Sequence, residues 1–293
     1  MSTPASPHVQ HIIGPLVTLE VHELLLTARA DMRETLACSL DLSRSQTSVQ
    51  IFADRWSWQG ASFPFLEVCK PRTIYYWNGE SFAPVARFSN SLLKLVPTDW
   101  GPPTFEIDGI KMLPTAQVSP FDDAREKVDL IAPRGKSVLD TCGGLGYFAA
   151  WCLERGAARI ASFEKNPDVL WLRRFNPWSP ASDEDRDSRY QLEVDDVSTA
   201  IARLPANEFD AVLHDPPRFA IAGELYSQAF YDELARVLRR NGKLFHYTGT
   251  PNKLTTGRDV PQEVANRLKR AGFATEPKLD GVLAVKKSGR VSR

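Results

Sequence analysis

The sequence predicts an α/β protein with a mostly parallel, Rossmann-like sheet that ends in an antiparallel hairpin and follows a small β-rich domain. The segment SVLDTCGGLGYFAAW, residues 137–151, has the pattern of a buried strand, a glycine turn and a helix. Strand-like and helix-like segments then alternate, which indicates a parallel sheet. The last two strand-like segments, TEPKL and VLAVKK, are separated by Asp280-Gly281, a dipeptide typical of tight hairpins.

The first 114 residues contain the smaller predicted domain. We expect residues 1–15 to be flexible, and we expect residues 16–38 to form one or two helices because their apolar positions suit a helix better than a strand. From about Ser48 to Met112, short β-like segments alternate with turn residues, and Asn78-Gly79 and Asp108-Gly109 favour two-residue hairpin turns. A boundary near Pro114 gives a mixed, β-rich domain over residues 16–114.

The smaller domain is rich in aromatic side chains. They suit either a small core or a surface that stacks on a planar substrate. The residues concerned are Trp56, Trp58, Tyr75, Tyr76 and Trp77.

Residues 115–293 form the larger predicted domain. Ser119 and Pro120 have the sequence of a helix start, with a serine N-cap and a proline at the first helical position, and this helix should reach about Leu130. The expected strands are SVLD, RIASFE, YQLEVDD, FDAVLHD and KLFHYTG. The expected helices cover residues 147–155, 167–175, 198–203, 227–239 and 261–271.

The composition argues against several other classes of protein. With 293 residues the chain can bury a core without disulfides, and its four cysteines have no C-x-x-C spacing, so we expect no disulfide framework and no metal centre. The 36 basic and 36 acidic residues cancel, which gives no global reason for tight nucleic-acid binding. Neither a signal-type N-terminus nor a run of about eighteen apolar residues occurs, so we expect a soluble, cytoplasmic protein.

The glycine turn predicts a nucleotide-like ligand. Asp140 ends the first strand of the larger domain, and Gly143, Gly144 and Gly146 let the backbone turn sharply and approach a ligand closely. Ligands of open α/β sheets bind beyond the carboxyl ends of the strands, where these residues lie. The turn alone does not identify the ligand, because with Ala149 it also fits the dinucleotide pattern G-x-G-x-x-A.

Two later strand ends carry further polar residues. Glu164 closes RIASFE, where a carboxylate can accept hydrogen bonds from both ribose hydroxyls of a nucleoside. HDPPRF, residues 214–219, follows FDAVL. Prolines fix φ and remove N–H donors, so the carbonyls of this loop and the Asp215 carboxylate stay available as acceptors for an amine or amide. A rigid turn capped by an aspartate is the plainer interpretation.

These residues together resemble class I S-adenosylmethionine-dependent methyltransferases, whose parallel sheet also ends in an antiparallel hairpin. DTCGGLG is similar to their D-x-G-x-G-x-G pattern, with Cys142 where the first glycine usually stands. The resemblance implies that Asp140 binds the amino group of the cofactor and that Glu164 binds its ribose. An acid after the third strand would bind the adenine amino group, and Asp196 and Asp195 compete for this role. The implied cofactor residues are Asp140, Cys142, Gly143, Gly144, Gly146, Glu164, Lys165, Asp195, Asp196, Val197 and Asp215.

Many methyltransferases hold a substrate nitrogen with D-P-P or N-P-P followed by an aromatic residue. The resemblance therefore implies that Asp215 is catalytic and that the acceptor contacts Pro216, Pro217, Arg218 and Phe219.

Three more residues flank the expected mouth of the cofactor site. His214, His246 and Tyr247 are candidates for catalysis, because a histidine there could take a proton near neutral pH. A histidine satisfied by backbone hydrogen bonds is an equal alternative. The polar segment 248–259 should cover the substrate, with Lys253 and Arg258 facing an anionic group or only solvent.

Residues 98–275 also resemble a group of predicted methyltransferases known chiefly from archaea, whose acceptor is not settled. The likeness rests on PPTFEIDGIKM, SPFDDAREKV, SVLDTCGGLGY and the run from HDPPRF to HYTGTP. DPPRF is similar to the D-P-P-K-F of ribosomal RNA cytosine-C5 methyltransferases, but FHYTG replaces their catalytic cysteine segment, which argues against covalent C5 chemistry.

LYSQAFYDELARVLRRNGKL resembles the polyamine aminopropyltransferases, which use decarboxylated S-adenosylmethionine and have a small N-terminal β domain. Val212 stands where these enzymes have an aspartate, and CGGLG replaces their G-G-G-D-G. Because a polycationic substrate requires carboxylates to bind and deprotonate it, these two differences weaken polyamine synthesis as a function.

The sequence therefore predicts methyl transfer from S-adenosylmethionine, most readily to a nitrogen of an acceptor held by the D-P-P-R-F loop. The alternatives are an aminopropyltransferase-like enzyme and a non-catalytic cofactor-binding protein. Zero net charge favours a small-molecule acceptor over protein or RNA, no metal is implied, and the oligomeric state stays open. Direct in-line displacement would obtain most of its rate gain from positioning.

Overall fold

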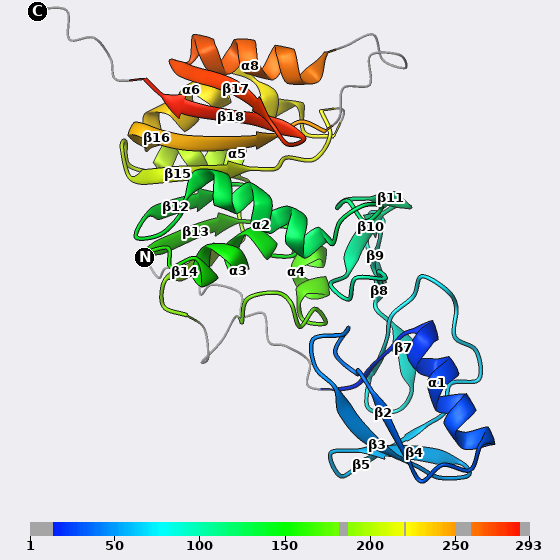
Figure 1. Ribbon diagram of the computed structural model, residues 1–293. Helices are drawn as coiled ribbons and strands as arrows, with labels where there is room; N and C mark the ends of the chain where they lie inside the picture. Colours follow the sequence, from blue (N-terminus) through cyan, green and yellow to red (C-terminus); the bar gives the residue numbers. More distant parts are fainter. Residues whose placement is uncertain (1–13, 182–186, 220, 250–258, 288–293) are drawn as a thin grey trace, which may run out of the picture. The chain divides into compact units, whose positions relative to one another are not determined.

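The computed structural model describes residues 14–181, 187–219, 221–249 and 259–287. Within these ranges the chain forms two compact units, one of residues 124–167 and 187–287 and one of residues 14–123 and 168–181. The large sheet lies in the first unit and the small antiparallel sheets lie in the second (Figure 1). The sequence-based division into residues 16–114 and 115–293 stays a prediction.

The β-rich unit contains three antiparallel sheets and the helix α1 (Leu19–Ala30). The sheets have the strand orders β1-β6-β7, β2-β3-β4-β5 and β11-β10-β9-β8. Their strands are β1 (Leu16–Val17), β2 (Thr35–Cys38), β3 (Thr47–Ile51), β4 (Arg55–Trp58), β5 (Ala61–Pro64), β6 (Tyr75–Trp77), β7 (Phe82–Pro84), β8 (Ala86–Phe88), β9 (Leu92–Val96), β10 (Thr104–Ile107) and β11 (Ile110–Lys111). The expected small β-rich part of the fold is therefore present.

Residues 16–38 hold one helix and two strands, so the expectation of one or two helices was right for residues 19–30 and wrong at both ends of the segment. Helix α1 begins after Thr18, whose hydroxyl accepts a hydrogen bond from the Val21 N–H, and ends before Met32, which has a left-handed φ of 53°. Strand β2 alternates exposed and buried residues and places Leu36 and Cys38 in the core. Pairing with β3 along four residues outweighs the local helical pattern, because the alternation buries both apolar side chains.

The aromatic residues of this unit mostly fill its core. Trp56 is 1% exposed, and its ring centroid lies 4.7 Å from that of Phe63 and 6.1 Å from that of Phe82. Trp77 packs edge-on against the same two rings, and Tyr75 is buried. Core packing therefore explains these three of the five aromatic residues better than stacking on a planar substrate.

The predicted hairpin turns were right in place and partly wrong in length. Asp108-Gly109 forms a two-residue turn, because Ile107 pairs with Ile110. Asn78-Gly79 lies in a four-residue turn between Trp77 and Phe82. In this turn the Asn78 side-chain oxygen accepts the N–H groups of Glu80 and Ser81. The side chain of Asn78 thus replaces the backbone bond of a tighter turn.

The α/β unit contains a seven-stranded sheet with the order β14-β13-β12-β15-β16-β18-β17. All its strands are parallel except β18, which pairs antiparallel with both neighbours. The strands are β12 (Ser137–Asp140), β13 (Arg159–Phe163), β14 (Tyr190–Glu193), β15 (Phe209–His214), β16 (Leu238–Tyr247), β17 (Phe273–Lys278) and β18 (Gly281–Lys286). In chain order within the sheet this is 3-2-1-4-5-7-6, whereas dinucleotide-binding sheets commonly have 3-2-1-4-5-6. The mostly parallel sheet with a terminal antiparallel hairpin is confirmed.

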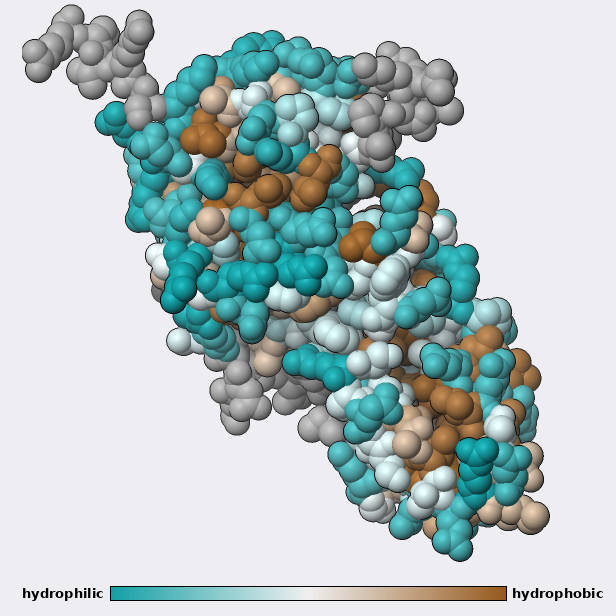
Figure 2. Space-filling view, in the orientation of Figure 1, coloured by the Kyte–Doolittle hydropathy of each residue, from teal (hydrophilic) through white to brown (hydrophobic). Residues whose placement is uncertain are grey.

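Helices connect these strands close to the predicted positions. Their bounds are α2 (Pro120–Ile131), α3 (Tyr147–Glu154), α4 (Pro167–Arg173), α5 (Val197–Ala200), α6 (Gln228–Val237) and α8 (Val260–Arg270), with short 3-10 helices η1 (Ile201–Arg203) and η2 (Gly223–Tyr226). Helices α5, α6 and α8 bury apolar side chains in one core with β15 and β16. Hydrophilic side chains cover the outer side of α8 (Figure 2), as expected for a helix that buries one stripe, including Val264 and Leu268.

The terminal hairpin turns one residue earlier than the sequence predicts. Lys278 pairs with Gly281, so the two turn residues are Leu279 and Asp280, and Leu279 has a left-handed φ of 49°. Gly281 instead belongs to β18. A Cβ at Gly281 would lie 2.3 Å from the His246 carbonyl oxygen, so glycine is required by the close approach of β16 rather than by the turn.

Candidate active site

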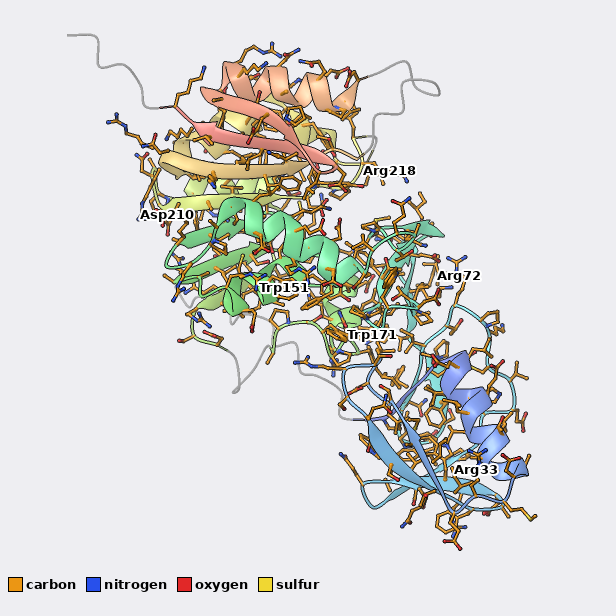
Figure 3. The ribbon with its side chains drawn as sticks, viewed as in Figure 1. Arg33, Arg72, Trp151, Trp171, Asp210 and Arg218 are labelled. Atoms are coloured by element: carbon orange, nitrogen blue, oxygen red, sulfur yellow. The ribbon has the colours of Figure 1, made fainter. Side chains whose placement is uncertain are left out.

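The polar residues of the first four strands meet at one edge of the sheet. Asp140 pairs in register with Ser162 and Leu213, and Phe163 pairs with Glu193, so the parallel strands end together. Figure 3 shows the direction of one of these strands. Asp210 lies near the start of β15, and Arg218 lies just beyond its carboxyl end, at the opposite end of the strand. This carboxyl edge is where open α/β sheets bind ligands.

The glycine turn is held by backbone hydrogen bonds to two neighbouring strands. The Thr141 N–H donates to the Leu213 carbonyl at 3.1 Å, and the Gly143 N–H donates to the Phe163 carbonyl at 2.7 Å. Gly144 and Gly146 have φ values of 48° and 83°, and Gly146 is the N-cap of α3. Side chains are strained in this left-handed region, which explains why both positions hold glycine.

Glu164 is fixed beside this turn. Its Oε2 accepts the Gly144 N–H at 2.9 Å, and its Oε1 accepts the Asn166 N–H at 2.8 Å. These two hydrogen bonds fix both carboxylate oxygens at the carboxyl end of β13. Binding of ribose hydroxyls by Glu164 stays a prediction.

Three carboxylates lie close to Cys142, at the centre of the turn. Burial raises the pKa of the Cys142 thiol well above its usual value; a hydrogen bond from Thr141 opposes this, and the negative charges of Glu164, Asp140 and Asp215 raise the pKa further. The thiol is therefore neutral, and the charges around it are negative. Such a site favours a ligand that carries positive charge near the glycine turn.

Asp140 lies deepest in the site. Its side chain is 0% exposed, and its Oδ2 accepts the Ser162 hydroxyl at 2.8 Å. This contact orients the carboxylate at the point where β12 becomes the glycine turn. Binding of a cofactor amino group by Asp140 stays a prediction.

The two competing aspartates after β14 have different partners. Asp196 caps α5 through the Ser198 N–H, and its Oδ2 lies 3.3 Å from the Lys165 Nζ. Asp195 instead forms an ion pair with Arg203, which follows α5 in the chain. Since Lys165 directly follows Glu164, Asp196 is the aspartate whose carboxylate lies toward the carboxyl end of β13. Val197 is buried in the core.

The loop after β15 presents its carbonyl groups unequally. The Arg218 carbonyl accepts the N–H groups of Ile221 and Ala222, and the Pro217 carbonyl accepts the Tyr226 hydroxyl at 3.1 Å. No hydrogen bond to the Pro216 carbonyl occurs within the described part of the chain. Of the backbone carbonyls of this loop, that of Pro216 is therefore the acceptor to consider for a substrate N–H.

Tyr226 is a site residue that the sequence reasoning missed. The pattern LYSQAF predicts a helix start at Ser227, whose hydroxyl accepts the Phe230 N–H. It does not reveal that the side chain of the preceding Tyr226 contacts Pro217, nine residues earlier in the chain. Phe219 packs edge-on against the Tyr226 ring, with centroids 5.5 Å apart, and Arg218 is exposed.

The two candidate histidines are buried and have both ring nitrogens in hydrogen bonds. His214 contacts the Thr141 hydroxyl through Nδ1 at 2.7 Å and the Leu225 carbonyl through Nε2 at 3.1 Å. His246 contacts the Tyr247 carbonyl through Nδ1 at 2.7 Å and the Tyr231 hydroxyl through Nε2 at 2.9 Å. Because a carbonyl can only accept, the proton of each neutral ring lies on the nitrogen that faces it.

Burial lowers the pKa of both rings. The pKa of His246 falls to about 4, and that of His214 falls well below its usual value, with the neighbouring His246 as a second cause. Their ring centroids are 4.4 Å apart. This geometry favours the structural interpretation of both histidines over proton transfer.

A second missed residue is Lys127 of α2. Its side chain is 1% exposed, its Nζ lies 3.4 Å from an Asp280 oxygen, and the same nitrogen lies 4.4 Å from the centre of the Tyr247 ring. In the sequence it stands in the helical stripe of Ala124, Val128 and Ile131, which is a visible signal of a buried lysine. The cation fixes the face of Tyr247, the remaining candidate for catalysis.

Some sequence-based expectations concern parts of the chain other than the carboxyl edge of the sheet. Lys253 and Arg258 lie outside the described residues. In the described ranges, no helix is long and apolar enough to cross a membrane, and no group of three metal-ligating side chains occurs.

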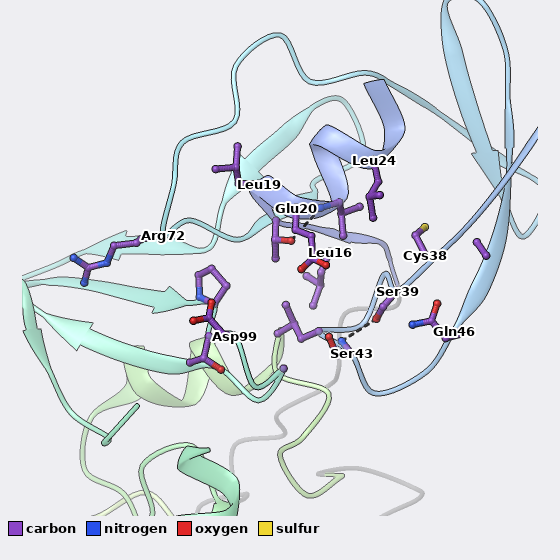
Figure 4. Close-up of a pocket in the computed structure, with 17 residues that line it drawn as sticks. Leu16, Leu19, Glu20, Leu24, Cys38, Ser39, Ser43, Gln46, Arg72 and Asp99 are labelled. Carbon is purple, nitrogen blue, oxygen red and sulfur yellow. Dashed lines mark hydrogen bonds between the residues drawn. The ribbon is translucent and has the colours of Figure 1, made fainter. Parts of the chain in front are cut away.

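A hollow of about 340 Å³ in the β-rich unit is a different kind of feature. Glu20, Ser43, Gln46 and Asp99, which line it, are all exposed (Figure 4). Without a buried polar group directed into it, this hollow does not have the character of a specific ligand site.

Proteins similar to this chain include a curated protein and two spermidine synthases of known structure. It is 38% identical over 284 residues to the uncharacterized protein MJ1233 of Methanocaldococcus jannaschii, which covers 92% of this chain and 95% of that protein. No model of a known protein family matches. A spermidine synthase in complex with the transition state analogue AdoDATO has a TM-score of 0.54 at 17% identity, over 70% of this chain and 74% of that one. The spermidine synthase of Thermotoga maritima has a TM-score of 0.52 at 16% identity, over 74% and 79% of the two chains. At these identities the likeness concerns the fold.

Proposed function

Because the chain belongs to the family of the MJ1233 protein of Methanocaldococcus jannaschii, whose activity its name leaves open, its function must come from the site, and we propose an S-adenosylmethionine-dependent methyltransferase. The observation that carries this proposal is the group of carboxylates, Asp140, Glu164 and Asp215, around Cys142 in the glycine turn.

The charge of this turn distinguishes between the cofactors. In a dinucleotide site the anionic pyrophosphate lies over the glycine turn, and three nearby carboxylates would repel it. S-adenosylmethionine carries an amino group and a sulfonium, both cationic, at the corresponding end. The charge pattern therefore supports this cofactor and argues against NAD, although both share the ribose that Glu164 fits.

Each part of the cofactor has a matching group in this chain. Glu164 would accept hydrogen bonds from the ribose hydroxyls. Asp196 would accept a hydrogen bond from the adenine amino group, and Lys165 would hold the Asp196 carboxylate in place. Asp140 would orient the amino-acid end through the turn that it supports. When bound, the cofactor supplies an electrophilic methyl group.

The acceptor would be held by the loop of Asp215–Phe219. The Asp215 carboxylate and the Pro216 carbonyl can accept the hydrogens of a nitrogen and so direct its lone pair at the methyl group. Exposed Arg218 would attract an anionic group elsewhere on the acceptor. Since His214 and His246 have no unused ring nitrogen, no side-chain base is assigned to them.

An aminopropyltransferase-like activity is the second candidate, because both solved structures described above are spermidine synthases by name. Against it, Val212 is fully buried in the core, so no acid stands three residues before Asp215. The β-rich unit agrees with either activity.

Calorimetry with three cofactors separates these possibilities. We expect binding of S-adenosylmethionine to the purified chain and weaker binding of its decarboxylated form and of NAD. Preference for the decarboxylated cofactor would favour the second candidate, and binding of NAD alone would overturn the proposal.

The Asp215→Ala variant tests turnover. Asp215 would hold the acceptor and is also one of the three carboxylates near Cys142. We expect methyl transfer from labelled S-adenosylmethionine to fall at least a hundredfold, and cofactor affinity to fall by less than about tenfold, because Asp140 and Glu164 remain. Asp232→Ala, on the exposed side of α6, is the control and should keep full activity. If the natural function of the protein survives Asp215→Ala unaltered, it is a cofactor-binding protein without catalysis.

A further inference from the structure

The short helix η2 connects the loop of Asp215–Phe219 to two other elements, β15 and α8. The Leu225 carbonyl accepts from His214 at the end of β15, and the Tyr226 carbonyl accepts the Arg267 Nη1 of α8 at 2.6 Å. The Tyr226 hydroxyl donates to the Pro217 carbonyl. η2 is thus anchored on the core side and reaches the loop through one phenol.

We propose that Tyr226 is a positioning residue for methyl transfer: its hydroxyl holds the Pro217 carbonyl and thereby sets the conformation of the loop from Asp215 to Phe219. This inference rests on the proposed function of that loop, and it adds a residue that does not touch the acceptor itself.

The loop needs such a donor because its own backbone provides few. Pro216 and Pro217 have no N–H, so they cannot form the backbone bonds that usually fix a turn. The Arg218 carbonyl is already used by Ile221 and Ala222 on the far side of the loop. Among the described residues, the Tyr226 hydroxyl is the side-chain donor to the proline pair, next to the Pro216 carbonyl and the Asp215 carboxylate.

Tyr226 is itself held in place and stays a donor. Its side chain is 4% exposed, and its ring lies 5.4 Å from the His246 ring and 5.5 Å from Phe219, measured between centroids. Burial raises the pKa of Tyr226, and the nearby charge of Asp215 raises it further. The phenol remains protonated, so its O–H is available to the carbonyl at any working pH.

The Tyr226→Phe variant removes the hydroxyl and keeps the ring. In the full-length protein we expect hydrogen exchange of the amides of Arg218, Phe219, Ile221 and Ala222 to become about three- to tenfold faster, the effect of one lost hydrogen bond. The Pro217 carbonyl carbon, labelled with ¹³C-proline and assigned by Pro217→Ala, should move upfield, since loss of a hydrogen bond reduces its deshielding. Packing alone would not move this signal.

Tyr231→Phe is the matched control, because its hydroxyl is also buried but contacts His246 and not the loop. It should leave both the loop exchange and the Pro217 signal as in the wild type. Arg267→Gln, which weakens the anchor of η2, should increase loop exchange to a smaller extent. The inference is overturned if Tyr226→Phe leaves the Pro217 signal unchanged, or if Tyr231→Phe alters the loop equally.

Calorimetry with S-adenosylmethionine keeps this inference separate from the proposed function. Tyr226→Phe should bind the cofactor with an affinity within about twofold of the wild type, because the hydroxyl does not contact the ribose pocket. If the wild-type protein binds no S-adenosylmethionine, the proposed function is wrong. The signal of the Pro217 carbonyl carbon would still report the hydrogen bond from Tyr226.

Discussion

At the scale of single residues, the site is defined by carboxylates that backbone groups orient. Glu164 accepts two N–H groups, one from the glycine turn and one from the start of the following segment, and this fixes both of its oxygens. Cys142 replaces the usual first glycine of the motif without adding charge, because the raised pKa of its thiol keeps it protonated. The negative charge of the site therefore comes from carboxylates alone.

Glu164→Gln tests the role of this residue. The variant keeps the size of the side chain but loses its charge and one acceptor, so we expect the affinity for S-adenosylmethionine to fall about ten- to hundredfold, as for loss of hydrogen bonds to a charged group. Titration calorimetry measures this. Glu193→Gln, exposed on β14, should bind the cofactor normally; equal losses in both variants would contradict the assignment.

At the scale of elements, the terminal hairpin completes the sheet by placing its last strand, β18, between β16 and β17. β18 pairs with β16 along five residues and with β17 along six, so it lies between them. Residues Phe245 and His246 of β16 leave no space for a side chain at the start of β18. The sheet order therefore depends on one glycine that approaches the backbone of the neighbouring strand.

Gly281→Ala should destabilise the protein. Its methyl group would lie 2.3 Å from the His246 carbonyl oxygen and 2.8 Å from Phe245 Cζ, so backbone must move, at a cost of about 1–3 kcal/mol. Urea unfolding measures the change. Gly14→Ala is the control, since no atom lies within 4 Å of its added Cβ. Wild-type stability of Gly281→Ala would show that β18 does not approach β16 as described.

At the scale of the whole molecule, stability should depend on pH through the buried histidines. Both have pKa values lowered by burial, so the unfolded chain binds more protons than the folded one at acidic pH. Their contribution is complete above the ordinary histidine pKa of 6.5 and is lost as the pH falls toward about 4. Aspartates with lowered pKa values, such as Asp210, lose their contribution only below about pH 4.

We expect the free energy of unfolding to fall by roughly 3 kcal/mol through His246 between pH 7 and pH 4, because its pKa lies at about 4 in the folded protein and near 6.5 in the unfolded chain, and His214 should act in the same direction. Urea unfolding at pH 7.0, 5.5 and 4.5 measures it. His246→Gln should reduce the slope by about one proton, since Gln cannot titrate. An unchanged slope in that variant would mean that His246 is not buried in its neutral form.

The sequence by itself determined the alternation of strands and helices, the glycine turn and the acids at the strand ends. These depend on local backbone preferences and on hydrophobic periodicity, which neighbouring residues reveal. The N-cap of α2 at Ser119 and the two-residue turn at Asp108-Gly109 followed from such local rules.

Tertiary structure decided the rest, because it depends on residues that are distant in the chain. Cys38 belongs to a strand since β3 pairs with it, and Gly281 serves the approach of β16 rather than a turn. The contact from Tyr226 to Pro217 and the partners of Lys127, which are Asp280 and Tyr247, could not be read from local patterns. Periodicity predicts which side chains turn inward, but only the packed fold determines which donor meets which acceptor.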